Sequence, residues 1–321
     1  MEKRCIGVDL GGTNIKVGVV DPSGNLLYKA ERPTGAEDGV DAVIARITSS
    51  AREAAEASGT SWNQIAGIGV GLPGFLDIPR GVVKRLTNLP WENVPIRELL
   101  EKAWNRPVMI DNDANVAALG EAWSGAGTGV SDLVCITLGT GVGGGVIAGG
   151  RLIHGVGGAA GEIGHIRIEE GGALCGCGQR GCLETIASAT GIVRMVKEMV
   201  SSGRETALAA AVRADTLSTR NVFREMEAGD PVAEEVIDRA TDALAQAMAT
   251  LSVILNPARF IIGGGVARAG EALFRPLRRA YQKRALPSAA EGVTIVPAQL
   301  GNDAGVIGAA GLVAHGGNGN I

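Results

Sequence analysis

The chain has 321 residues, with 30 Lys and Arg against 34 Asp and Glu, and its net charge of −4 disfavours a nucleic-acid binder built on a basic surface. Aromatic residues make up only 3%, which predicts an aliphatic core and leaves few platforms for stacking bases. The 45% hydrophobic content argues against disorder, and the length lies near the size at which one core divides into two.

Apolar periodicity predicts a strand-rich first half. Its elements in chain order are strands over 5–10 and 15–20, a third strand after a turn at 21–25, a helix over 40–51, a strand over 65–70 with a loop at 71–74, a strand over 108–110 and an Ala-rich helix over 115–123. Residues 133–150 are uncharged but include seven glycines, so they predict two strands around a loop rather than a membrane helix. We therefore expect no membrane association.

The second half is predicted to be mainly helical. Its elements are a helix from an Asp230-Pro231 N-cap to Leu255, a strand over 259–262 that enters three glycines at 263–265, a helix from about Gly270, and a small-residue helix over 303–312 that packs back on the first half. We expect two lobes. The small lobe comprises residues 1–118 and 302–321, and the large lobe comprises residues 119–301.

Two glycine loops share one pattern. At a constant offset of 127 residues, the second copy repeats the first in Gly139, Thr140, Gly145, Val146 and Ile147 against Gly12, Thr13, Gly18, Val19 and Val20. This repeat predicts two related loops that offer backbone N–H groups to a phosphate chain in a shared cleft. Asp9 ends the first strand and can hold Mg²⁺, while Thr13 and the loop amides bind phosphate oxygens. An Asx turn closing a hairpin is the competing interpretation of this segment.

Four polar residues stand where a strand ends and a helix begins: Asp111, Asn112, Asp113 and Asn115. One of them is expected to cap the helix. A carboxylate there can accept the proton of an alcohol that attacks phosphorus, while a neighbouring amide fixes that alcohol. Asp113 is our candidate for this base.

Three cysteines and one histidine have the spacing of a metal site: His165, Cys175, Cys177 and Cys182. Three thiolates and an imidazole suit one tetrahedral zinc ion, and four filled positions indicate a structural role. Cys5 and Cys135 lie in apolar strands and are interpreted as buried thiols.

Two glutamates, Glu162 and Glu184, flank this site. A surface glutamate considered alone is usually solvated. Held by a rigid metal loop beside His165, they become good acceptors for the vicinal hydroxyls of a sugar. No role is assigned to His154.

Together these segments resemble the ROK family (repressors, open reading frames, kinases) over nearly the whole chain, with no departure from its motif set. The resemblance rests on residues 9–14, 71–74, 86–91, 111–115, 138–141, 162–165, 175–184 and 262–265. It implies an α/β, two-lobed, actin-like (ribonuclease-H-like) ATPase fold with an inserted structural zinc loop.

The resemblance also implies a role for each site residue, with Asp113 as the catalytic base. The implied sugar-binding residues are Gly71, Asn88, Asn112, Asp113, Glu162, His165 and Glu184. The implied nucleotide-binding residues are Asp9, Gly11, Gly12, Thr13, Asn14, Lys16, Gly139, Thr140 and Gly141, with Gly263, Gly264 and Gly265 on the adenosine side.

The activity implied by the resemblance is transfer of the γ-phosphoryl group of MgATP to the 6-hydroxyl of glucose. A kinase for N-acetylmannosamine or another hexose is the alternative, because one altered contact can redirect hexose choice. Polyphosphate is the alternative phosphoryl donor. We expect a cytoplasmic homodimer or homotetramer.

Two other classes of protein share parts of this pattern. ROK repressors carry a helix-turn-helix segment ahead of the first phosphate loop, and here the first strand is expected to begin by about Cys5, which leaves no room for one. An actin-like filament protein would share the phosphate loops but would not need a zinc-braced sugar pocket. Both classes are therefore disfavoured.

Overall fold

The computed structural model describes residues 3–86 and 88–316, so Thr87 of the 86–91 segment and the 317–321 end of the predicted small lobe lie outside the described residues. The chain divides into two compact units. Unit 1 contains Met1–Cys135, Gly145–Gly161 and Gln299–Ile321, and unit 2 contains Ile136–Gly144 and Glu162–Ala298. The lobe boundaries expected at residues 118 and 302 stay a prediction.

Unit 1 contains a five-stranded sheet of order β3-β2-β1-β4-β8. Its strands are β1 (Arg4–Leu10), β2 (Asn14–Val20), β3 (Leu26–Pro33), β4 (Ile65–Leu72) and β8 (Val108–Asn112). β1 and β2 are antiparallel, whereas β1, β4 and β8 run parallel. A smaller sheet, which the sequence did not predict, contains β5 (Gly74–Asp77), β6 (Val82–Leu86) and β7 (Glu92–Val94).

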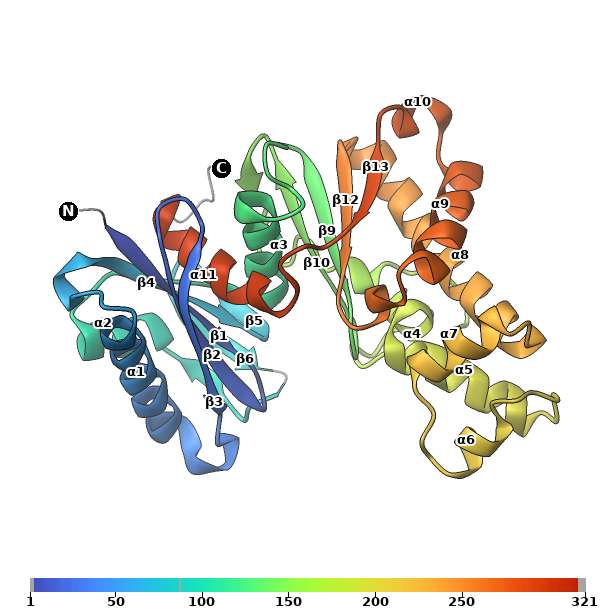
Figure 1. Ribbon diagram of the computed structural model, residues 1–321, viewed down its shortest axis with the longest axis horizontal. Helices are drawn as coiled ribbons and strands as arrows, with labels where there is room; N and C mark the ends of the chain where they lie inside the picture. Colours follow the sequence, from blue (N-terminus) through green and yellow to red (C-terminus); the bar gives the residue numbers. More distant parts are fainter. Residues whose placement is uncertain (1–2, 87, 317–321) are drawn as a thin grey trace. The chain divides into compact units, whose positions relative to one another are not determined.

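Helices cover both faces of the large sheet (Figure 1). One face packs on α1 (Gly39–Ala57) and α2 (Ile96–Trp104), and the other on α3 (Asp113–Ser124) and α11 (Ala304–Ala314). Alternation along β1 explains this, because Ile6 and Val8 join the core on the α1 side while Cys5 contacts α11. α11 lies very close to the sheet, since a Cβ on Gly69 would lie 1.7 Å from the Ala309 carbonyl oxygen. The predicted packing of the C-terminal helix on the first half is confirmed.

A second sheet has the order β11-β10-β9-β12-β13, and the boundary between the units passes through β9 and β10. Its strands are β9 (Leu133–Leu138), β10 (Val142–Ala148), β11 (Arg151–Leu152), β12 (Arg259–Gly263) and β13 (Thr294–Pro297). The predicted pair of strands within residues 133–150 is therefore confirmed.

The helices of unit 2 include a long one, α8 (Pro231–Leu255), which packs on α9 and α7 (Figure 1). The other helices are α4 (Glu184–Ala187), α5 (Ala189–Ser201), α6 (Ala209–Arg213), α7 (Thr219–Glu227), α9 (Glu271–Arg284) and α10 (Pro287–Ala290). Asp230 caps α8 by accepting the Val232 and Ala233 N–H groups at 3.0 Å, as predicted. Within residues 3–86 and 88–316, no helix is long and apolar enough to cross a membrane.

Candidate functional site

The candidate residues fall into two groups, one in each unit. The unit 1 group lies where the parallel strands β1, β4 and β8 end. The strand register pairs Asp9 with Gly71, Gly71 with Asp111, and Leu72 with Asn112. Because parallel strands present their carboxyl ends at one edge, three segments distant in sequence meet there.

Asp9 faces a lysine across the β1–β2 hairpin. The register sets Asp9 directly opposite Lys16, and Lys16 Nζ lies 3.4 Å from Asp9 Oδ2. Burial raises the pKa of the Asp9 carboxyl, and the Lys16 charge offsets part of that shift. Lys16 therefore partly compensates the burial of this carboxyl, and the Mg²⁺ role of Asp9 stays a prediction.

The first glycine loop is a tight turn, in which Gly11 N–H donates to the Asn14 carbonyl at 2.9 Å. Asn88 lies against this turn, since a Cβ on Gly12 would be 2.6 Å from the Asn88 Cβ. The side-chain amide of Asn14 donates to Glu31 at 2.6 Å. The predicted phosphate loop and Asn88 are thus neighbours within unit 1.

Asn112 is the N-cap of α3, which meets the expectation that one polar residue here caps the helix. Its Oδ1 accepts the Ala114 N–H at 2.8 Å and the Asn115 N–H at 3.4 Å, and its Nδ2 donates to the Gly74 carbonyl at 3.4 Å. Asp113 is the first helical residue, and its side chain is exposed. The candidate base therefore stands at the positive end of a helix, where a negative charge is favoured.

Asp111 is fully buried and forms a pair that the sequence analysis missed. Its Oδ1 accepts the Asn112 N–H at 2.7 Å and the Asn115 amide at 2.9 Å, while its Oδ2 lies 2.5 Å from His154 Nε2. The hydrogen bond to Asp111 raises the pKa of His154. The available signal was that His154 is one of three histidines in the chain and Asp111 ends an apolar strand.

The unit 2 group contains the second glycine loop. Gly139 N–H donates to the Gly141 carbonyl at 2.9 Å, and Thr190 Oγ1, in the first turn of α5, donates to the Thr140 carbonyl at 2.7 Å. Gly264 lies against the strand that leads into this loop. It has a φ of +87°, and a Cβ there would lie 2.4 Å from the Leu138 carbonyl oxygen. The two glycine segments assigned to the nucleotide are therefore neighbours.

A cavity of about 700 Å³ opens beside Thr140. Helices α5 and α7 line it with Thr190, Val193, Arg194, Lys197 and Ser218, among others. This volume is typical of small-ligand sites. None of the lining residues except Thr140 was predicted from the sequence, because the helix periodicity alone does not show which turn faces a cavity.

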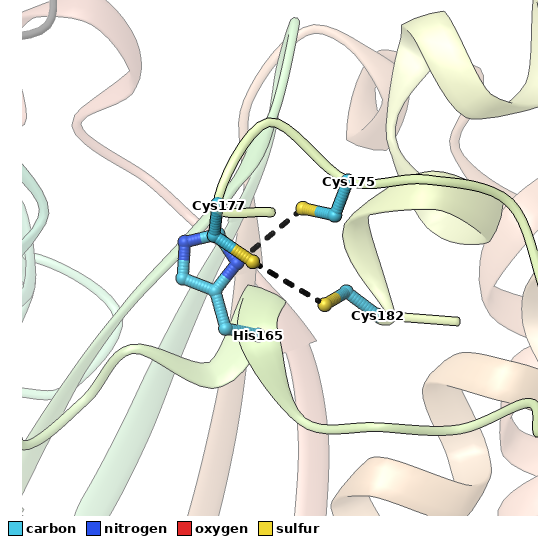
Figure 2. A group of neighbouring side chains, drawn as sticks. All are labelled: His165, Cys175, Cys177 and Cys182. Atoms are coloured by element: carbon cyan, nitrogen blue, oxygen red, sulfur yellow. Dashed lines mark hydrogen bonds between the residues drawn. The ribbon is translucent and has the colours of Figure 1, made fainter. Parts of the chain in front are cut away.

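The predicted metal ligands are brought together in unit 2 (Figure 2). His165 Nδ1 lies 3.6 Å from Cys175 Sγ, and Cys177 Sγ lies 3.7 Å from Cys182 Sγ. Ligands about 2.3 Å from a tetrahedral zinc lie roughly 3.8 Å from one another. The Cys₃His cluster therefore fits one structural zinc ion.

Glu162 and Glu184 adjoin two different residues of this cluster, since Glu162 lies beside His165 and Glu184 Oε1 lies 3.4 Å from Cys175 Sγ. His165 turns Nδ1 to the cysteines and Nε2 toward Glu162, whose Oε2 is 3.8 Å away. Glu184 begins α4, and its Oε2 accepts the Val142 N–H at 3.0 Å. A Cβ on Gly141 would lie 2.3 Å from Glu184 Oε2. Glu184 thus connects the zinc loop with the second glycine loop.

In a comparison with known protein families, the model of the ROK family matches residues 5–315 of this chain. The glucokinase of Halalkalibacterium halodurans is 44% identical over 314 residues, covering 97% of this chain and 95% of its own. The glucokinase of Thermotoga maritima is 40% identical over 97% of both chains. A crystal structure of a ROK family glucokinase from Streptomyces griseus in complex with glucose and AMPPNP superposes with a TM-score of 0.80 at 35% identity, covering 98% of this chain and 100% of that chain.

Proposed function

Because the chain belongs to the ROK family, we propose that it is an ATP-dependent glucokinase, which transfers the γ-phosphoryl group of MgATP to the 6-hydroxyl of glucose. The observation that carries this proposal is the exposed Asp113 carboxylate at the first position of α3, directly after the capping Asn112. A carboxylate at that place can take the proton of an attacking hydroxyl.

In this proposal Asp113 orients the 6-hydroxyl and accepts its proton, and Asn112, Asn88 and Gly71 are assigned to contacts with the sugar. Catalysis then depends mainly on positioning and charge neutralisation. Bound Mg²⁺ supplies charge neutralisation at the phosphates, and Asp9 is the carboxylate that would hold it, directly or through water. Lys16, 3.4 Å from Asp9, adds a second positive charge.

The phosphates of the nucleotide are assigned to the two glycine loops. The amides of Gly139, Thr140 and Gly141 bind phosphate oxygens, as do those of Gly11, Gly12 and Thr13 with the flanking Asn14 in unit 1. The adenosine is assigned to the side of Gly263, Gly264 and Gly265 and to the 700 Å³ cavity beside Thr140. The cavity is lined by Arg194, Lys197 and Glu198, and Arg194 and Lys197 form ion pairs with Glu198 and Asp215, respectively.

The sugar hydroxyls are assigned to Glu162, His165 and Glu184. His165 can serve zinc and sugar together, because its two ring nitrogens face different partners. Bound zinc would fix the orientation of the His165 ring, and Asp113 remains the residue assigned to proton transfer.

A coupled assay of ADP release over a panel of hexoses tests the proposal. Glucose should give the highest kcat/KM with ATP as donor. A preference for N-acetylmannosamine or mannose would reassign the substrate within the family, a preference for polyphosphate would reassign the donor, and release of no ADP with any hexose would contradict the kinase itself.

The assembly and the compartment belong to the same proposal. We expect a homodimer or homotetramer, which light scattering with size-exclusion chromatography would measure. Because ATP is the proposed phosphoryl donor, we assign the reaction to the cytoplasm.

A further inference from the structure

The buried pair of Asp111 and His154 has no part in the proposed chemistry, yet it adjoins the candidate base. Asp111 is 0% exposed, and among the described residues its one recorded ion pair is with His154. A buried carboxylate is tolerated only when hydrogen bonds or a cation compensate it. His154 therefore compensates one of the two carboxylate oxygens of Asp111, Oδ2.

The other carboxylate oxygen of Asp111, Oδ1, forms hydrogen bonds with residues at the start of α3. Asp111 Oδ1 accepts the Asn112 N–H at 2.7 Å and the Asn115 side-chain amide at 2.9 Å. Asn112 then caps the helix, and Asp113 is its first residue. One carboxylate thus joins the imidazole of His154 to the backbone that immediately precedes the candidate base.

The backbone of His154 is itself anchored. It follows β11 closely, and its carbonyl accepts the Ala160 N–H at 3.0 Å. The ring also borders a cavity of about 600 Å³ in unit 1, so a smaller side chain here would admit water to Asp111. Water would satisfy the carboxylate without fixing its position.

On the basis of the proposed kinase function, we infer that His154 is a positioning residue for phosphoryl transfer. It holds Asp111 in place and thereby fixes the position of Asp113 at the start of α3. The physical reason is the narrow tolerance of such sites. A general base must be held within about 0.5 Å of its productive geometry, and a displacement of about 1 Å can cost on the order of 100-fold in rate.

The test is a mutant cycle between His154 and Asp113. His154→Ala should lower kcat by about 10-fold to 100-fold, with KM for ATP within about twofold of the wild type. His154→Gln, whose amide N–H can also donate to Asp111, should recover most of that loss. In the Asp113→Asn background, His154→Ala should cost less than about threefold, because the base that it positions is already gone.

Arg151→Gln is the matched control, since it removes an exposed cation from the same segment and should leave kcat within about twofold. If His154→Ala does not fold, Asp111→Asn enters the cycle in its place. The inference is overturned by a folded His154→Ala that keeps more than half of the wild-type kcat, or by an equal loss in both Asp113 backgrounds. A wild type that phosphorylates no hexose contradicts the proposed function instead.

Discussion

The candidate residues of the two units are held in place by different means. In unit 1, strand register places Asp9, Gly71 and Asp111 side by side. Asn112, the residue before Asp113, is fixed as the N-cap of α3. In unit 2, the segment between His165 and α4 is largely irregular and is held by the isolated bridges Arg167–Cys182 and Leu174–Arg180. Regular strand pairing therefore orders the first group, whereas we expect the irregular Cys₃His segment of the second group to need bound zinc in addition to its two bridges.

The largest expected effect is removal of the zinc ion, which should disturb unit 2 and spare the strand register of unit 1. Cys177→Ala should lose the bound metal, lower the melting temperature by at least about 5 °C and raise KM for glucose. Metal analysis, calorimetry and steady-state kinetics measure the three quantities. Cys5→Ala, which removes a buried thiol outside the cluster, should keep the zinc. Purified wild type without zinc or a substitute metal would refute the metal-held account.

The second expected effect concerns the unit 1 group alone. Asp113→Asn keeps the shape of the side chain and its place after the Asn112 cap, so the fold and sugar binding should remain. Without a proton acceptor, kcat should fall on the order of 100-fold or more. Turnover is measured at saturating glucose and ATP, with zinc content and melting temperature as controls. A variant that retains more than a tenth of wild-type kcat would remove Asp113 from this role.

The third expected effect tests whether Glu184 serves the sugar or the glycine loop. Glu184→Gln can still accept the Val142 N–H but offers a sugar hydroxyl an amide in place of a charge. Loss of a hydrogen bond to a charged group should cost about 1.5–3 kcal/mol in kcat/KM for glucose, with a smaller change in KM for ATP. The exposed Glu170→Gln is the matched control near the zinc loop. An equal rise in KM for ATP would assign Glu184 to the phosphate loop.

The sequence predicted those parts of the molecule that depend on local pattern. The strands around both glycine loops, the Asp230 cap of α8 and the Cys₃His cluster follow from periodicity, capping preference and ligand spacing. The pair of Asp111 and His154 could not be predicted in this way, because it joins residues 43 apart through tertiary packing. The short sheet β5-β6-β7 was missed for a similar reason, since its strands are too short for a clear period.

The smallest expected effect is on the stability of unit 1. It tests whether the pair of Asp111 and His154 also stabilises the fold. Asp111 raises the pKa of His154 above its unfolded value of about 6.5. The charged pair is then fully present below that value, and its contribution is lost as the pH rises through the folded pKa.

His154→Gln keeps a hydrogen-bond donor but cannot titrate, so the stability of the wild type relative to this variant should be greatest near pH 6 and should decline toward pH 9. The change should be on the order of 1 kcal/mol, the difference between a charged and a neutral hydrogen bond. Urea unfolding of both proteins across this range measures it. The other ionisable groups at the same cavity, Asp77, Lys84, Arg97 and Glu101, are common to both proteins and cancel in the comparison. A difference in stability that stays constant or grows with pH would show that the imidazole acts as a neutral donor, and the unit 1 site would then be ordered by hydrogen bonds without a buried charge pair.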